Sequence, residues 1–399
     1  MALDVARIRS SFPALKQGVA YFDGPGGTQV PAEVARAVAE TLTSGISNRG
    51  TVTAAERRAD VVTVGARSAV ADLLGCTPEG VVFARSMTQM TYDLARALAK
   101  TWRADDEVVV TRLDHDANIR PWVSAAEAVG AKVRWAEFDK ETAELTVDHV
   151  RDQLSDRTRL VAVTGASNIL ATRPDIPAIA GAVHEVGALL HVDGVHLTPH
   201  APIDVAALGG DFYACSPYKF LGPHHGVLAA DPALLEQIEP DKLLPSSNAV
   251  PERFELGTLP YELLAGTTAA VDFIAGLASD AEDRRTRVVQ SMRAVEEHEE
   301  GLFARLLDGL GAIDAVTLHG SPKRRTPTAL FSVRGHSPLA VYQALAERGV
   351  NAPASHFYAI EAVRWMGLGD AGAVRAGLAP YTNDEDVDRL VSGVKEIAR

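Results

Sequence analysis

One lysine of this sequence stands in surroundings that suit chemistry better than solvation. Lys219 lies in the segment SPYKFLGPHHG (216–226), directly after an apolar strand candidate, and its neighbours are small or apolar. Burial lowers the pKa of a lysine, and the neutral amine can attack a carbonyl carbon to form a Schiff base. Because a single lysine is more often a solvated surface residue, the interpretation depends on its companions.

Two further segments supply the companions that such a lysine needs. Asp193 ends the apolar run of LLHVDGVH (189–196), where a carboxylate is costly unless it is paired. The segment VVFARSMTQMTYDLARALA (81–99) predicts a strand that turns into a helix, and backbone N–H groups at a helix start suit a phosphate. Together these features suit pyridoxal 5′-phosphate (PLP), whose pyridine nitrogen an aspartate keeps protonated. The ordinary alternatives are a turn aspartate and a helix N-cap.

An alternation of short apolar runs with amphipathic stretches predicts the sheet that would position these residues. Such an alternation implies right-handed crossovers and a mostly parallel sheet, whose ligands bind outside the carboxyl ends of the strands. After about residue 280 a charged helix at 281–309 precedes the strand candidates of a smaller sheet. The strand candidates of the large sheet are 107–111, 132–138, 159–167, 189–194, 211–216 and 225–230.

Composition excludes several classes of partner. The net charge of -13, from 39 basic and 52 acidic residues, argues against nucleic acid and anionic membrane as the main partner. The two cysteines, Cys76 and Cys215, make no disulfide framework and have no metal-type spacing around them. The N-terminus lacks the apolar core of a signal peptide, and no apolar run is long enough for a membrane span. We therefore expect a cytoplasmic protein without a metal site.

The three features occur in the same order along the chain as in a known family: first the helix start that suits a phosphate, then Asp193, then Lys219. The chain resembles fold-type I PLP enzymes of the class V aminotransferase family, and more closely its cysteine-desulfurase-like branch, over essentially its whole length. The resemblance implies an α/β fold: a large domain with a mostly parallel seven-stranded sheet, plus a smaller α+β C-terminal domain. It implies an N-terminal segment (1–20) packing on the small domain, a PLP-binding domain (21–280) and a small domain (281–399).

The resemblance also implies roles for individual residues. Lys219 takes the Schiff-base position, Asp193 the pyridinium position, and TRLDHDANIRPW (111–122) places His115 against the cofactor ring; these three are implied as catalytic. Further cofactor contacts are implied for Met87, Thr88, Asn168, His196, Ser216, Tyr218 and Thr258.

Two other segments imply how substrate and subunits bind. VRAGLAPYTNDEDVDRL (374–390) resembles the segment whose arginine holds the substrate carboxylate, here Arg375, with Asn168 and Tyr358 completing the substrate pocket. RFELGT (253–258) resembles a loop that reaches the neighbouring subunit's phosphate, so a homodimer with shared active sites is expected.

The departures from the family pattern bear on the reaction. In GVNAPASHFYA (349–359), Tyr358 falls where desulfurases carry the nucleophilic cysteine, and Pro353 falls where they carry an arginine. Tyr218 replaces the usual histidine, and Ser86-Met87-Thr88 replaces the common Gly-Thr-Thr. A thiolate that could carry a persulfide is therefore missing from that loop.

The favoured hypothesis is a PLP-dependent lyase or transferase that acts on an α-amino acid through an external aldimine. Its most specific form is a C–S lyase-like β-elimination on a cysteine derivative. The alternatives are an aminotransferase, epimerase or decarboxylating enzyme of the same family, a cysteine desulfurase that feeds a sulfur acceptor, and a non-catalytic PLP-fold binding protein.

Overall fold

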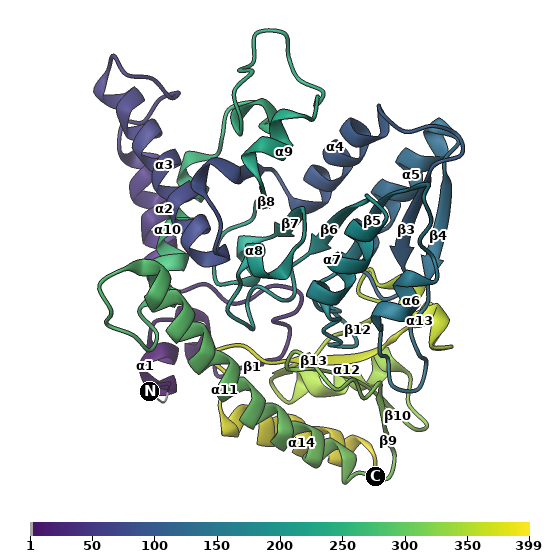
Figure 1. The fold of residues 1–399 in the computed structure, drawn as a ribbon. Helices are drawn as coiled ribbons and strands as arrows, with labels where there is room; N and C mark the ends of the chain where they lie inside the picture. Colours follow the sequence, from purple (N-terminus) through teal and green to yellow (C-terminus); the bar gives the residue numbers. More distant parts are fainter. Residues whose placement is uncertain (1–2) are drawn as a thin grey trace.

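A seven-stranded sheet forms the centre of the larger part of the chain. The structure is a computed structural model and describes residues 3–399. The strand order is β2-β8-β7-β6-β5-β3-β4, and every pairing is parallel except the two made by β8 (Figure 1). The strands are β2 (Val81–Ala84), β3 (Glu107–Thr111), β4 (Lys132–Ala136), β5 (Thr158–Thr164), β6 (Leu189–Asp193), β7 (Phe212–Cys215) and β8 (Gly226–Ala230).

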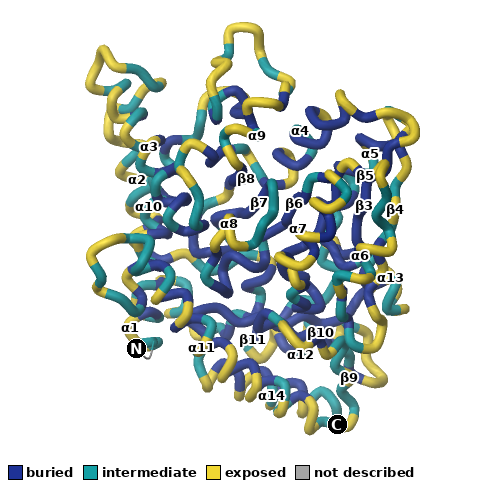
Figure 2. Tube along the Cα trace, viewed as in Figure 1, coloured by how far each residue is buried: buried dark blue, intermediate teal, exposed yellow. Residues whose placement is uncertain are grey.

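Alternating residues of these strands face two separate cores. Val109 packs in one apolar cluster, whereas Val108 and Val110 pack in another, because successive side chains of a strand point to opposite faces. Both faces are buried, so the central strands are dark blue in Figure 2. The covering helices are α2 (Ala32–Thr43), α3 (Ala54–Leu74), α4 (Met87–Ala99), α5 (Arg120–Val129), α6 (Val147–Arg151), α7 (Ile176–Glu185), α8 (Val205–Leu208), α9 (Pro232–Glu236) and α10 (Tyr261–Ala275).

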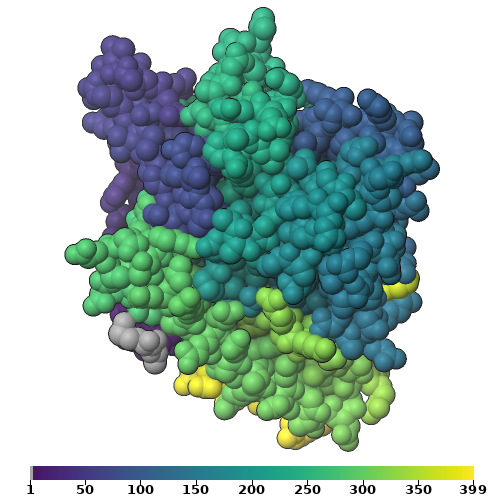
Figure 3. All heavy atoms as spheres, in the orientation of Figure 1, coloured from purple at the N-terminus to yellow at the C-terminus, as the bar shows by residue number. Residues whose placement is uncertain are grey.

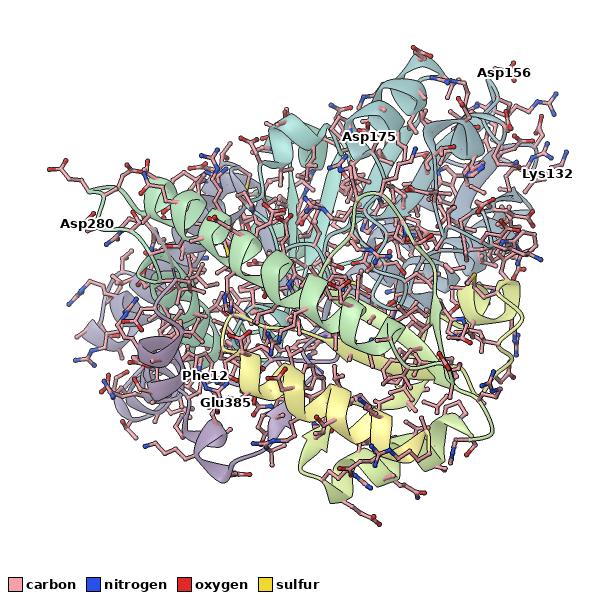
Figure 4. The ribbon with its side chains drawn as sticks, turned by 90° about the horizontal axis from the view of Figure 1, so that it is seen from below. Phe12, Lys132, Asp156, Asp175, Asp280 and Glu385 are labelled. Carbon is pink, nitrogen blue, oxygen red and sulfur yellow. The ribbon has the colours of Figure 1, made fainter. Side chains whose placement is uncertain are left out.

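A second, antiparallel sheet of order β12-β13-β10-β9 forms the smaller part. Its core is a separate apolar cluster that includes Phe331 and Leu390. The long helix α11 and the C-terminal helix α14 lie side by side along it (Figure 4). Its elements are α11 (Arg284–Gly311), β9 (Val316–His319), β10 (Thr328–Val333), α12 (Pro338–Glu347), β12 (Ala354–Ser355), α13 (Ile360–Trp365), β13 (Ala373–Gly377) and α14 (Asp384–Ile397).

The N-terminal segment joins the two parts. Arg9 forms an ion pair of 2.6 Å with Asp386 of the smaller part, and the Phe12 ring packs on Phe273 of α10 in the larger part with centroids 5.7 Å apart. Its elements are α1 (Val5–Ser10), η1 (Pro13–Gln17) and β1 (Ala20–Tyr21), which pairs in parallel with β11 (Val350–Asn351). The remaining short turns are η2 (Pro78–Gly80), η3 (Asp116–Asn118), η4 (Pro217–Lys219) and η5 (Glu252–Phe254). Residues 1–2 of the expected segment 1–20 lie outside the described residues, and the domain boundaries stay predictions.

The expected fold class is confirmed, and the strands differ from expectation only at their ends. β4 stops at Ala136 rather than at residue 138 because its only neighbour, β3, ends at Thr111, directly opposite. Among residues 3–399, no helix is both long and apolar enough to cross a membrane. The same residues contain no group of His, Cys, Asp and Glu side chains that could hold a metal ion.

Candidate active site

The carboxyl ends of the parallel strands surround a cavity with about 510 Å³ of empty space. This is the edge at which open α/β sheets bind ligands. Adjacent strands deliver the predicted residues because β5, β6 and β7 are neighbours in the sheet and all end here. The predicted residues that line this cavity are Met87, Thr88, His115, Asn168, Asp193, His196, Ser216, Tyr218 and Lys219.

Lys219 is held in an apolar turn that lowers its basicity. It ends η4, directly beyond β7, and only 8% of its surface is exposed. Nζ donates a hydrogen bond to the carbonyl oxygen of Pro25. Burial, followed by the repulsion of Arg375, lowers the pKa of Lys219 to about 7, and Asp193 offsets part of the effect. A substantial fraction of this amine is therefore neutral at physiological pH.

Asp193 is a buried carboxylate with little local compensation. It ends β6, and Oδ1 accepts the backbone N–H of Val195 at 2.9 Å. Burial raises the pKa of Asp193 to about 6, while that hydrogen bond and the charge of Lys219 hold it down. Gly194 lets the strand end sit here, since a Cβ at that position would lie 2.0 Å from the Tyr213 ring. A cationic group in the cavity would compensate the buried charge.

His115 lies at the start of η3 and is neutral. Burial, then the charges of Lys219 and Arg375, lower its pKa to about 3. Its Nδ1 accepts the backbone N–H of Ala117 at 3.0 Å, which assigns the ring proton to Nε2. A neutral, flat ring at the cavity wall suits stacking on an aromatic ligand.

Two buried polar atoms in cavity-lining residues lack a partner among the described residues. One is Asn168 Oδ1, whose amide nitrogen donates to the carbonyl of Phe357 at 3.0 Å. The other is His196 Nδ1, whose Nε2 lies 3.1 Å from the hydroxyls of both Thr326 and Thr328. Buried polar groups normally have partners, so these two atoms indicate a polar ligand.

The N-terminus of α4 forms the far end of the cavity. Ser86 caps the 13-residue helix by accepting the N–H of Gln89 at 3.1 Å, so its hydroxyl is already engaged. Ser86, Thr88 and Ser216 line the cavity at this end. Gly226 permits the arrangement, because a Cβ there would lie 2.4 Å from the backbone nitrogen of Met87. The helix dipole and free N–H groups favour an anion.

A second, wider cavity of about 1170 Å³ opens from the first and contains Arg375. Arg375 lies on β13 of the smaller sheet and is 2% exposed. Its guanidinium donates to the carbonyl of Asn168 at 3.0 Å and lies 3.8 Å above the Phe357 ring. Burial lowers the pKa of Arg375 to about 9, and Asp23 offsets part of this effect. A partly compensated guanidinium of this kind is suited to bind a carboxylate.

Tyr358 lines the mouth of this second cavity on a fixed loop. Its ring stacks on His115 with centroids 5.5 Å apart, and 69% of its surface is exposed. Phe357 and Tyr358 both have positive φ angles of 49° and 57°, which is uncommon outside glycine. Their carbonyls accept from the Asn168 amide and from the Asp116 backbone N–H at 2.7 Å. These contacts to the larger part hold the strained turn in place.

Sequence reasoning missed the stretch Asp23 to Gly27, which forms part of the wall. Pro25 and Gly26 line the wider cavity. A Cβ on Gly26 would lie 3.3 Å from the guanidinium of Arg375. The available signal was the glycine-rich turn that directly follows a short strand.

Three residues singled out in the sequence lie away from both cavities. Thr258 is exposed and lines neither cavity of its own chain, as a contact made to a neighbouring subunit would require. Among residues 3–399, no cysteine lines either cavity. Cys76 is half-buried and Cys215 is buried, and burial raises the pKa of both thiols, to about 12 for Cys76.

Comparisons with known proteins agree with this architecture. Residues 20–390 match the family model described as Aminotransferase class-V. An uncharacterized protein, MT3887, from Mycobacterium tuberculosis is 35% identical over 401 residues, which cover 100% of both chains. The aminotransferase-like protein FGM3 from Gibberella zeae is 32% identical over 409 residues, which cover 99% of each chain.

A solved structure shares the fold over the same length. The cysteine desulfurase CsdA from Escherichia coli superposes with a TM-score of 0.87 at 25% sequence identity. The match covers 99% of this chain and 98% of that chain.

Proposed function

The chain belongs to the class V aminotransferase family, and on that premise we propose that it is a PLP-dependent enzyme that catalyses β-elimination on an S-substituted cysteine. The observation that carries the proposal is a pair of connected cavities whose described walls combine a buried lysine, a buried aspartate and a buried arginine and contain no cysteine. Two unpaired cysteines suit a reducing cytoplasm, where we propose that the enzyme works.

The residues present fit PLP by the chemistry of their donors and acceptors. Lys219 would hold the aldehyde carbon, Asp193 the ring nitrogen, and the start of α4 with Thr88 and Ser216 the phosphate. His115 would stack on the ring, and the unpartnered atoms of Asn168 and His196 would meet its polar edge. Tyr218 would complete the phosphate side, and Thr258 would serve the neighbouring subunit. When bound, the cofactor supplies an electron sink for charge that develops at the substrate Cα.

The chain's own side chains would supply positioning and proton transfer. Arg375 would hold the substrate carboxylate with two parallel hydrogen bonds, while Asn168 and Tyr358 would line the rest of the pocket. The Lys219 amine, whose pKa is lowered to about 7, would remove the Cα proton as general base. The hydroxyl of Tyr358, at the mouth, would give a proton to the departing sulfur.

The absence of a usable thiol favours elimination over persulfide transfer. Sulfur transfer needs a thiolate beside the substrate sulfur. Within residues 3–399, both cysteines lie outside the cavity walls, and burial raises the pKa of both thiols. The open mouth beside Tyr358 leaves room for a substituent on sulfur. Elimination consumes the S-substituted cysteine and water and yields a free thiol, pyruvate and ammonium.

The reaction is tested by supplying S-methyl- and S-benzyl-L-cysteine and measuring thiol, pyruvate and ammonium by mass spectrometry and enzymatic assay. We expect the three products in equal amounts. A 2-oxo acid that retains the sulfur would establish aminotransfer instead, and racemised substrate or released CO₂ would establish epimerisation or decarboxylation. L-Cysteine should leave no protein-bound persulfide, whereas a persulfide on Cys76 or Cys215 formed at the turnover rate would restore the desulfurase alternative. No change in any amino acid would support a non-catalytic binding protein.

Arg375→Lys should weaken substrate use while leaving cofactor content unchanged. A lysine cannot reproduce the planar fork, so kcat/KM should fall by about 10- to 100-fold, the scale of one strong charged hydrogen bond. Steady-state kinetics and the cofactor absorption spectrum measure the two effects. Arg364→Lys, at an exposed arginine paired with Asp370, is the matched control. Equal turnover of amines that lack a carboxylate would contradict the role of Arg375.

We also propose that the active unit is a homodimer. Two segments project from the body in Figure 3, and they carry the exposed apolar residues Val52, Leu243 and Leu244. Exposed apolar surface marks sites of protein association, and a two-fold dimer is the commonest assembly of soluble proteins, so we take a second copy of this chain as the partner. Leu244→Glu, at a side chain that is 97% exposed, should therefore produce inactive monomers in sedimentation, whereas Leu339→Glu on α12 should not. A fully active Leu244→Glu monomer would refute the shared site.

A further inference from the structure

A third cavity, separate from the proposed active site, lies between α11 and the loop before β10. It spans about 1080 Å³ of empty space and is partly open to solvent. We call it the α11 cavity; its walls come from α11 between Glu296 and Leu307, from residues 323–327, and from Arg173 and His200. It therefore lies where the larger part of the chain meets the smaller one.

Two charged side chains of the α11 cavity have polar atoms that no described residue satisfies. Glu299 is 1% exposed; its Oε2 lies 2.8 Å from His200 Nδ1, but its Oε1 is buried without a partner. Arg325 is half-buried; its guanidinium donates weakly to the Gly320 carbonyl at 3.3 Å, and its Nε has no partner. Burial accordingly lowers the pKa of Arg325. An unsatisfied acceptor and an unsatisfied cation in one cavity indicate a ligand that carries both a donor and an anion.

The charge of the wall favours an anionic ligand of low charge. Four cationic side chains (Arg173, Lys323, Arg324 and Arg325) and three acidic ones (Glu296, Glu299 and Glu300) line the cavity together with His200. Arg173 and Glu296 neutralise each other in an ion pair of 2.6 Å. The remaining glutamates would repel a doubly charged phosphate ester about twice as strongly as a monocarboxylate.

Part of the wall is apolar. Phe303, Ala304 and Leu307 lie on one face of α11, because residues three and four apart are neighbours on a helix. The Arg325 guanidinium lies 5.6 Å from the Phe303 ring centroid. A ligand carboxylate bound to Arg325 would thus have its carbon chain beside the apolar face.

We propose that the α11 cavity is a second binding site, for a small monocarboxylate that carries a hydrogen-bond donor and an apolar side. Arg325, with Lys323 and Arg324, binds the carboxylate. The Glu299 carboxylate accepts a hydrogen bond from the ligand's donor group, and Phe303 and Leu307 contact the ligand's apolar side.

The α11 cavity shares structural elements with the proposed active site. Thr326 lines it and places its hydroxyl 3.1 Å from Nε2 of His196, which lines the first cavity. The Arg173 backbone N–H donates to the Arg324 carbonyl at 2.9 Å, five residues beyond Asn168 in the chain. A ligand bound to residues 323–327 would therefore contact a segment that also meets His196 of the first cavity.

Isothermal titration of the holoenzyme with N-acetyl-L-leucine tests this site. This probe is a monoanion with an N–H donor and an apolar side chain, and its blocked amine cannot react as a substrate amine. We expect one molecule to bind per chain, and Arg325→Gln to weaken binding by about tenfold or more. Because Arg325 is half-buried, Lys323→Gln/Arg324→Gln, at two exposed positions, provides a second variant that should also weaken binding.

The controls separate binding in the α11 cavity from binding elsewhere on α11 and from general anion binding. Arg293→Gln, at an exposed residue of α11 outside the cavity, should bind as the wild type does. The neutral N-acetyl-L-leucinamide and inorganic phosphate should bind more weakly than N-acetyl-L-leucine. The proposal is overturned if N-acetyl-L-leucine does not bind at millimolar concentration, if both cavity variants bind it undiminished, or if phosphate binds as tightly.

Discussion

Lys219→Ala should abolish covalent attachment of the cofactor and reduce turnover by at least about 10²- to 10⁴-fold, the contribution of a positioned general base. The reason is local: this amine is 8% exposed and has a pKa lowered to about 7. The walls of the two active-site cavities contain no other lysine among the described residues. Borohydride reduction followed by peptide mapping should therefore find a pyridoxyl group on Lys219 in the wild type.

The same pKa gives a pH dependence with a defined sign. Only the neutral amine reacts with an aldehyde, so the rate at which cofactor-free protein takes up PLP should rise with pH through about 7 and level off above it. With an exposed lysine, the uptake rate would keep rising until the pH reached the ordinary lysine pKa of about 10.4. Lys132→Ala, at an exposed position labelled in Figure 4, is the matched control and should behave as the wild type. A pyridoxyl group mapped to another lysine would refute the assignment.

Asp193→Ala should retain part of the cofactor and lose turnover by at least about 10²-fold, the scale for removing one preorganised electrostatic partner. Without the carboxylate, nothing in the β6 turn would keep the ring nitrogen protonated. Asp193→Asn, which keeps the shape and removes the charge, should lose a similar factor, so that the loss reports charge rather than packing.

Turnover and cofactor content should be measured on the same preparations. The ratio of the two separates impaired chemistry from impaired loading. Wild-type turnover per bound cofactor in Asp193→Asn would exclude Asp193 from the reaction.

Glu361 explains why the Tyr358 loop is fixed. Its carboxylate accepts from Arg112 at 2.9 Å and from Arg120, and it lies in the first turn of α13, which follows Tyr358. Trp365, at the other end of α13, donates to the Phe138 carbonyl at 2.9 Å. A loop that leads directly into a helix held at both of its ends suits a fixed pocket wall better than it suits a carrier that must swing outward.

The sequence alone determined the features that depend on neighbouring residues. Short apolar runs that alternate with amphipathic stretches specified the strands and helices. The α4 start, Asp193 and Lys219 each lie at the end of a strand or just after it, which placed all three at the same sheet edge. Because parallel strands joined by right-handed crossovers all end on that edge, no long-range information was needed. The mostly parallel sheet was accordingly predicted correctly from these patterns, and its seven strands from the family resemblance, with errors confined to strand ends such as that of β4.

The tertiary structure decided what depends on contacts between distant segments. The hydrogen bond from Arg375 to the Asn168 carbonyl joins residues 207 positions apart, and Thr326 meets His196 across 130 positions. The pKa of Lys219 likewise depends on burial and on Arg375, neither of which has a local sequence signature. Local patterns specify which face of an element is buried, but the packing of two sheets against each other fixes which charges meet and which remain unpartnered, as at Glu299 and Arg325.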